Sequence, residues 1–284
     1  MWQSLPSHVS PFIIQTPWFA LHWYGFMYVV AYVLIGALVA YRIRTESWLI
    51  TRDQAVSLLL WSVVGLAVGA RLGYAAFYEP TNFIQNPLLL IWPFERVSGG
   101  LAIVGLQGFS YHGGLVGIVV ASLMACRRYR VKPLDIADLF LPAIPLGYAF
   151  GRIGNFLNGE LYGRVTSVPW AMIFPTDPFY APRHPSQLYE AMLEGVLIFS
   201  ILWPLRRCRP FKGWMLAAYL VLYGFARFAV EFFREPDPQL GLIFGPLTMG
   251  QCLSAAMIIA GFVTGAVFFA NHRRSSLHGE GRAA

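Results

Sequence analysis

The sequence has little charge and few cysteines, and it lacks the marks of a secreted or metal-binding domain. Only 12% of its 284 residues are charged, whereas a soluble domain carries about a quarter. Its cysteines, Cys126, Cys208 and Cys252, have neither CxxC nor metal-type spacing, so we expect no disulfide framework and no zinc site. The first residues, MWQSLPSHVSPF, contain neither a basic stretch nor a small-residue cleavage site, which argues against a cleaved signal peptide.

What the sequence has in excess is apolar and aromatic surface. Hydrophobic residues make up 57% of the chain and the mean hydropathy is +0.54. Nine Trp, fourteen Tyr and 22 Phe form the kind of aromatic surplus that populates membrane interfaces. This is more apolar surface than one water-soluble core can bury, so the composition indicates an all-α protein of the lipid bilayer.

Seven segments are apolar enough to be spanning helices, which need roughly 20 such residues each. They are His22–Tyr41, Ala55–Tyr74, His112–Cys126, Leu134–Phe150, Leu188–Leu205, Gly213–Val230 and Pro246–Ala270. Pro142 and Pro145 lie inside the fourth, which we therefore expect to be kinked or broken.

Basic residues predict the orientation of these segments. Fourteen of the 21 Lys and Arg follow the first, third, fifth and seventh segments, as the positive-inside rule requires of cytoplasmic loops. The prediction is a single membrane domain over residues 1–284 with a periplasmic N-terminus, a cytoplasmic C-terminus and periplasmic loops at 75–111, 151–187 and 231–245. This clustering also argues against a nucleic-acid partner as the reason for the +7 net charge. Seven arginines remain that topology does not explain: Arg71, Arg96, Arg152, Arg164, Arg183, Arg227 and Arg234.

The densest polar string, GRIGNFLNGELYGR, covers Gly151–Arg164 at the outer end of the fourth segment. Its glycines let backbone amides approach an anion, and arginine offers a planar fork that matches phosphate oxygens. A tight loop whose arginines merely snorkel to lipid headgroups is the alternative, but it has no need of Asn155, Asn158 and Glu160 in the same place.

A second string places charge inside a spanning segment. Tyr223, Arg227, Glu231 and Arg234 are spaced so that they form one stripe of a helix. Charged residues in a span are costly and usually face the bundle interior. A structural Arg227–Glu231 pair that only fixes helix packing remains the alternative.

Three shorter strings complete the set. YHGGL carries His112 at a helix mouth, where it is either a general base or a structural histidine. RHPSQLYE leads into the fifth segment, and Glu190 and Glu194 lie four residues apart on one face there. They could form a cap and an interhelical hydrogen-bond station, and this is the interpretation we favour for Glu194. LHWYG contains Tyr24, and its aromatic residues, together with Trp18, also suit an interfacial belt.

With the predicted topology, all five strings lie on the non-cytoplasmic side. An arginine-rich, partly buried pocket there suits an anionic lipid headgroup. The sequence has no acidic relay at mid-membrane and no inverted pair of broken helices, which disfavours an ion transporter.

These strings, in this order, resemble the characteristic blocks of the prolipoprotein diacylglyceryl transferase family, and the likeness runs from about Leu21 to Ala270. The resemblance implies an inner-membrane enzyme that moves the sn-1,2-diacylglyceryl group of phosphatidylglycerol to the lipobox cysteine thiol of a prolipoprotein. The products are a thioether and glycerol 1-phosphate, and this is the first step of bacterial lipoprotein maturation. Phosphatidylglycerol, the lipobox peptide and membrane lipids are then the partners, and no cofactor or metal is expected.

The resulting hypothesis assigns residues to two roles. The catalytic candidates are Arg152, Arg227, His112, Glu160 and Glu231. The substrate-binding candidates are Tyr24, Asn155, Asn158, Gly163, Arg164, Tyr223 and Arg234. Arg152 and Arg227 are expected to hold the phosphate, and His112, Glu160 or Glu231 to accept the thiol proton.

Two stretches depart from the family pattern, since 165–182 looks short and 101–107 looks like extra sequence. Two other functions stay open at this point. The same pocket could bind or translocate phospholipid without chemistry, or it could serve a different headgroup-processing enzyme.

Overall fold

The computed structural model describes residues 3–16, 20–91, 94–97, 100–103, 108–235 and 242–280. The chain forms two compact units, Met1–Ser47 with Leu134–Ala284, and Trp48–Pro133. The two are described separately, because their placement relative to one another is not determined. Both are mostly helical, and the strands form only two-stranded antiparallel pairs.

The first unit begins with the short elements η1 (Leu5–His8), β1 (Phe12–Gln15) and β2 (Ala20–His22). Its helices are α1 (Trp23–Thr45), α5 (Pro133–Phe140), α6 (Ile144–Leu157), α7 (Ser186–Glu190), η3 (Ala191–Leu197), α8 (Ile198–Leu205), α9 (Trp214–Val230) and α10 (Met249–Glu280). Two further strand pairs are β5 (Met172–Ile173) with β6 (Pro182–Arg183), and β7 (Leu242–Phe244) with β8 (Leu247–Thr248). The second unit contains α2 (Arg52–Phe77), α3 (Pro80–Gln85), η2 (Pro87–Leu90), β3 (Phe94–Val97), β4 (Gly100–Ile103) and α4 (Tyr111–Tyr129).

Every segment predicted to be an apolar helix is helical in the structure. By length and composition, four helices of the described residues can cross a membrane: α1, α2, the α7–η3–α8 rod and α10. A fifth candidate is the α5–α6 pair, which bends by 60° and so confirms the break predicted at Pro142 and Pro145. The shorter α9 is apolar as well. The chain is therefore a multi-pass helical membrane protein, while the seven crossings and their orientation stay a prediction.

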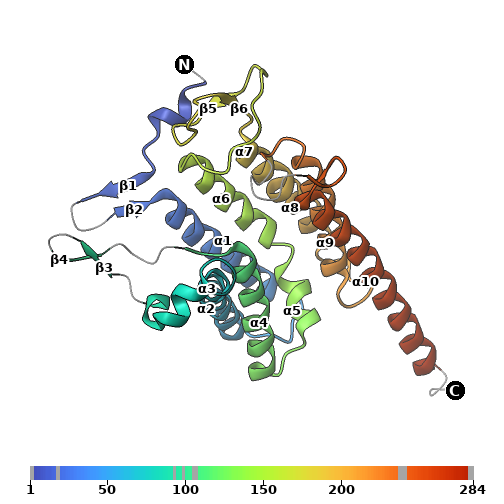
Figure 1. Ribbon diagram of the computed structural model, residues 1–284. Helices are drawn as coiled ribbons and strands as arrows, with labels where there is room; N and C mark the ends of the chain where they lie inside the picture. The colour runs from blue at the N-terminus through green and yellow to red at the C-terminus, as the bar shows by residue number, and fades with distance from the viewer. Residues whose placement is uncertain are drawn as a thin grey trace. The chain divides into compact units, whose positions relative to one another are not determined.

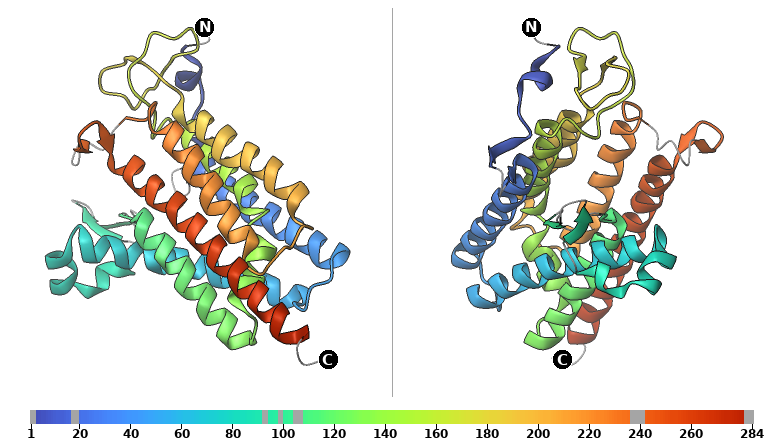
Figure 2. Two further views of the ribbon diagram at one scale, coloured as in Figure 1. Left: turned by 90° about the vertical axis from the view of Figure 1, so that its right-hand side faces the viewer. Right: turned by 60° about the vertical axis from the view of Figure 1, so that its left-hand side comes forward.

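The helices of the first unit pack in a row (Figures 1 and 2). The helix α6 contacts α1 on one side and the α7–η3–α8 rod on the other. Next, α9 packs on this rod, and α10 packs on α9. Ile198, Leu202 and Met215 are buried together between α8 and α9. This order brings the C-terminal half of α6, the start of the rod and the end of α9 to one place.

A buried arginine stabilises the bend between α5 and α6. Arg42 is fully buried, and its Nη1 donates to the carbonyls of Asp138 and Leu139 at 2.7 and 2.6 Å. These carbonyls lie at the end of α5, where a helix leaves backbone oxygens without intrahelical partners. Glu46 pairs with Arg42 at 2.8 Å, and Arg206 and Arg209 join the same carboxylate at 3.3 and 2.8 Å. Basic residues that the sequence assigned to topology alone therefore also hold the bundle together.

The second unit is built on close contact between two helices. Gly65, Gly69 and Gly73 of α2 face Gly113 and Gly117 of α4, and a Cβ at Gly113 would lie 2.8 Å from the Cα of Gly73. Small residues at four-residue spacing let helix backbones approach one another in a membrane.

Arg71 of α2 anchors the segment that follows this helix. It donates to the carbonyls of Leu90 and Gly108 at 3.1 Å each, and also to that of Leu89. One of the seven unexplained arginines therefore has a structural role. Of the other predictions in this unit, the side chain of Arg96 and residues 104–107 lie outside the described residues, as does Trp18 in the first unit.

Candidate active site

Glu190, at the end of α7, is the centre of a buried charged cluster. Its side chain is fully buried, and three arginines from α6, α9 and the segment after α9 converge on it. Arg152 Nε of α6 lies 2.7 Å from Oε2, and Arg234 Nη1 lies 2.7 Å from Oε1. Arg227 Nη1 of α9 lies 3.5 Å from Oε2. One carboxylate thus fixes the guanidinium groups of helices that are far apart in the sequence.

A second buried carboxyl and a tyrosine complete the inner layer. Glu194 is fully buried and lies 3.7 Å from Arg227 Nη1. The Tyr148 hydroxyl contacts Glu194 Oε2 and lies 3.3 Å from Glu190 Oε2, and it accepts a 2.7 Å hydrogen bond from Arg152 Nε. The Tyr148 ring packs edge-on against Tyr223 of α9 at 5.9 Å. Tyr148 therefore connects Arg152 to both carboxyls.

The rod that carries these carboxyls departs from α geometry next to the cluster. Ala191–Leu197 form a π-helix, a rare element that is frequent at functional sites. Gly195 lies within it against α6, where a Cβ would meet the Ala149 Cα at 3.0 Å. The close approach of the two backbones at this glycine brings Glu190 and Glu194 within reach of Tyr148 and Arg152.

The predicted signature string forms the next layer. Arg152 Nη1 donates to Asn155 Oδ1 at 3.3 Å, and Asn155 Nδ2 donates to Glu160 Oε1 at 3.0 Å. Asn158 Nδ2 donates to the same oxygen at 3.4 Å. The Glu160 carbonyl in turn accepts from Gln187 Nε2 at 2.7 Å. The amides and Glu160 therefore orient Arg152 through Nη1, while Tyr148 contacts its Nε.

Glu231 closes the cluster after α9. Its Oε2 lies 2.8 Å from Arg227 Nη2 and 3.6 Å from Arg234 Nε. Its Oε1 accepts from Thr248 Oγ1 at 3.0 Å, and a Cβ at Gly250 would lie 2.5 Å from its carboxyl carbon. The start of α10 thus holds Glu231 in place. The formal charges of the cluster balance, with three arginines against the carboxyls of Glu190, Glu194 and Glu231. The arginine side chains are only 13–17% exposed.

Comparison with known proteins decides the family. The family model described as prolipoprotein diacylglyceryl transferase matches residues 11–267. The chain is 46% identical to the phosphatidylglycerol–prolipoprotein diacylglyceryl transferase of Chlorobaculum tepidum over 260 residues, which cover 92% of this chain and 90% of the relative. The chain belongs to the prolipoprotein diacylglyceryl transferase family. Proteins of the same name from Coxiella burnetii and Bordetella bronchiseptica are 46% and 42% identical over 89% of this chain and 93% of their own.

The predicted site residues of this family member divide into three groups. Arg152, Asn155, Asn158, Glu160, Tyr223, Arg227, Glu231 and Arg234 lie in the connected network. The other candidates of the first unit lie beside it: Tyr24 donates to the Tyr28 hydroxyl at 3.0 Å and packs against α6 at Gly154, and Arg164 Nε donates to the Arg234 carbonyl at 2.7 Å.

Close packing explains why a glycine is required at position 163. It forms a bridge with Arg234, and a Cβ there would lie 2.9 Å from the Cβ of His184. Glycine thus lets the signature loop pass close to the chain that carries Arg234.

His112 belongs to the other unit. It is exposed in the first turn of α4, beside the Tyr111 ring, and Ser110 caps that turn by accepting from the Gly113 N–H at 3.3 Å. Its role as the base therefore stays a prediction.

Sequence reasoning about this family member missed Tyr148, did not count Glu190 among the site residues, and favoured a structural hydrogen-bonding role for Glu194. A signal was present, because two carboxyls one turn apart in an apolar segment are costly unless cations meet them. Their partners come from α6 and α9, and only the packing of these helices identifies them.

A hydrogen-bonded loop follows α6 at the same end of the first unit. Asp177 is fully buried, and Arg183 donates to it at 2.6 and 3.0 Å. These hydrogen bonds, together with those from the Phe179 and Ala181 N–H groups, hold the pKa of Asp177 below its usual value. The Asp177 partner raises the pKa of Arg183, and burial lowers the pKa of His184 beside it. The loop between Arg164 and Arg183 is therefore fixed by a buried ion pair.

Proposed function

We propose that this chain transfers the sn-1,2-diacylglyceryl group of phosphatidylglycerol to the lipobox cysteine thiol of prolipoproteins, the first step of bacterial lipoprotein maturation. The names of the relatives give both substrates. The observation that carries the proposal is the convergence of Arg152, Arg227 and Arg234 on one buried carboxylate. A preorganised group of guanidinium donors in a site of low dielectric is suited to hold a phosphate.

In the proposed reaction, the cysteine sulfur attacks the glyceryl carbon that is bonded to the phosphate oxygen. A C–S bond forms, the C–O bond breaks, and glycerol 1-phosphate departs with the bonding electron pair. Arg152 and Arg227 stabilise the charge that develops on the departing phosphate, and loss of one such donor costs about 3 kcal/mol. The thiol proton passes to His112, Glu160 or Glu231.

The remaining candidates shape the substrate site. Tyr24, Asn155, Asn158, Gly163, Arg164, Tyr223 and Arg234 are proposed to line it. Asn155 and Asn158 act by holding Glu160 and Arg152, to which their side chains are hydrogen-bonded. Arg234 supplies the third guanidinium group, and its backbone carbonyl fixes Arg164.

The proposed setting is the bacterial inner membrane. Seven spans of one membrane domain place the N-terminus and the loops at 75–111, 151–187 and 231–245 in the periplasm and the C-terminus in the cytoplasm. The active site then faces the periplasm. Support comes from the separation of charge along α9, whose start lies beside the basic segment Arg206–Lys212 and whose end carries the cluster.

The test incubates the purified protein with phosphatidylglycerol and a lipobox peptide and measures the peptide mass. A gain of one diacylglyceryl group is expected, and it must vanish when the cysteine is replaced by serine. Arg152→Ala and Arg227→Ala are each expected to lower kcat by about 100-fold or more. The exposed Arg128→Ala is the matched control with unchanged activity. Lipid binding without any mass gain would refute the transferase and leave a lipid-binding protein.

A further inference from the structure

An apolar groove lies on the first unit, apart from the charged cluster. It has a volume of about 570 Å³, within the usual size of ligand sites. Its walls come from α8, α9 and α10 and include Leu205, Trp214, Ala218, Phe262 and Ala266. On α9 the lining runs from Trp214 to Leu222, so it ends before Arg227.

One end of the groove is basic. Phe211, which lines the groove, contacts the ring of Phe269 at 6.0 Å. The Arg273 guanidinium lies over the Phe269 ring, 5.9 Å from the ring centre. Lys212 follows Phe211 directly and is 65% exposed, with only a 3.4 Å ion pair to Asp135. Two cations therefore stand where the apolar lining ends.

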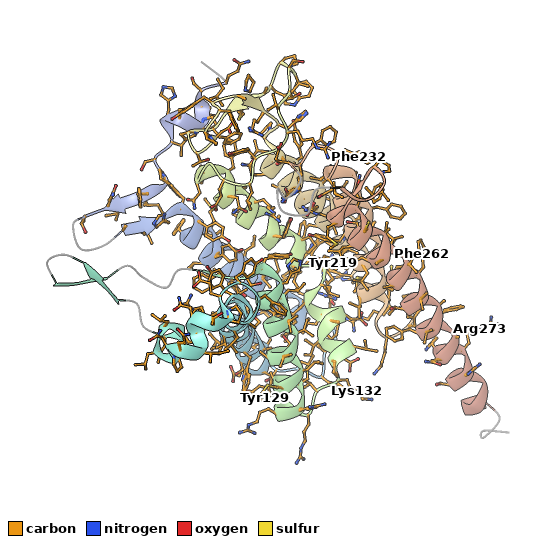
Figure 3. The ribbon with its side chains drawn as sticks, in the orientation of Figure 1. Tyr129, Lys132, Tyr219, Phe232, Phe262 and Arg273 are labelled. Atoms are coloured by element: carbon orange, nitrogen blue, oxygen red, sulfur yellow. The ribbon has the colours of Figure 1, made fainter. Side chains whose placement is uncertain are left out.

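The helix geometry continues the groove toward these cations. Four residues of α10 are spaced by three or four positions and therefore share one face of this helix: Phe262, Ala266, Phe269 and Arg273. Figure 3 shows the side chains of Phe262 and Arg273 along this helix. The apolar groove is complementary to an acyl chain, and the two cations at its end are complementary to an anionic headgroup.

We propose that this groove binds one acyl chain of an anionic phospholipid whose phosphate is held by Lys212 and Arg273. The site is separate from the proposed transfer site. On α9 the groove lining stops at Leu222, before Arg227 of the cluster, and Lys212 at the other end of the groove is largely exposed. The headgroup therefore sits at the basic end, and the chain runs toward the middle of the bundle.

Native mass spectrometry of the full chain, titrated with dioleoyl phosphatidic acid or dioleoyl phosphatidylcholine, tests the proposal. The wild type is expected to retain one more phosphatidic acid than phosphatidylcholine. Lys212→Gln combined with Arg273→Gln is expected to weaken that binding roughly 30-fold, because each cation near the surface contributes about one kcal/mol. Ala266→Trp fills the groove from an exposed position and is expected to remove the extra lipid.

Matched controls lie on an adjoining face of α10, about 100° around the helix from the test residues. Arg274→Gln and Val267→Trp are expected to keep the extra lipid. Equal retention of phosphatidylcholine, or an unaltered lipid count in Ala266→Trp, overturns the proposal. So does a dimer that Ala266→Trp converts to monomer, since the groove would then hold a second copy.

Transfer kinetics separate this site from the substrate site. The Lys212 and Arg273 substitutions and Ala266→Trp are expected to leave the KM for phosphatidylglycerol unchanged. A raised KM in Ala266→Trp alone, with the charge variant unaffected, would make the groove the acyl slot of the substrate and overturn the proposal. A chain without transferase activity would refute the proposed function, while the lipid count would still decide the groove.

Discussion

Replacing Glu190 by glutamine tests whether one carboxylate organises the cluster. The change keeps the side-chain shape but leaves three arginines around a neutral amide, where Arg152 and Arg234 each lose a 2.7 Å ion pair. Removing one partner of a buried ion pair costs about 3–5 kcal/mol. At about 2 °C per kcal/mol for a chain of this size, Tm is expected to fall by roughly 6–10 °C.

The matched control is Glu235→Gln. Glu235 makes an ion pair of similar length, 3.1 Å to Arg183, but its side chain is 48% exposed. An exposed pair contributes about 0–1 kcal/mol, so this variant is expected to remain within 2 °C of the wild type.

Both variants would be unfolded in detergent by heat and by a denaturing-surfactant titration, and their transfer kinetics would be measured. Because Glu190 orients Arg152 but is itself negative, its loss is expected to lower kcat without raising the KM for phosphatidylglycerol. If Glu190→Gln were as stable as Glu235→Gln, the cluster would not depend on this carboxylate and the reasoning would be wrong.

Three further outcomes are expected. Tyr148→Phe keeps the ring but removes the hydroxyl that joins Arg152 to the carboxyls, so it should lose about 1–3 kcal/mol of stability and lower kcat, as thermal unfolding and peptide mass would report. Gly117→Leu should prevent α2 and α4 from packing, since a Cβ there already overlaps the Gly69 backbone, whereas Gly25→Ala, with open space around it, should be tolerated in a protease-resistance assay. Asp177→Asn should lower Tm at pH 7, and because the pKa of Asp177 is depressed, the difference from wild type should start to shrink as the pH falls below about 4 and should disappear only below that depressed pKa; a difference that stays constant or grows as the pH is lowered from 7 to about 2 would contradict this assignment.

Much of the helical architecture is predictable because hydropathy and proline act locally. The segment containing Pro142 and Pro145 is broken where the missing backbone donors require it. The helix termini shift by a few residues, as between the predicted Pro246–Ala270 and the observed Met249–Glu280. What a linear pattern does not contain is the packing of α6 between α1 and the rod, on which the site depends.

Site residues were predictable where several polar types gather in one string, as with Asn155 and Glu160. They were not predictable where a single side chain acts through distant partners. Glu190 becomes the hub only when Arg152 approaches it from α6, and Arg227 and Arg234 approach it from α9 and the segment that follows. Arg42 becomes structural only when it reaches the carbonyls at the bend after α5. Both depend on contacts between residues more than 35 positions apart.

The π-helix at Ala191–Leu197 has a consequence for how the rod can change. A π turn holds one more residue than the α turn it replaces. Deleting one residue there would restore continuous α geometry and leave Ile198–Leu205 facing nearly the same way, because the wide turn absorbs the extra residue locally. Glu190 lies just before the π-helix in the chain, and Leu205, which lines the groove, lies after it. The rod can thus carry one additional residue beside its charged end while the face of Ile198–Leu205 that packs on α9 stays the same.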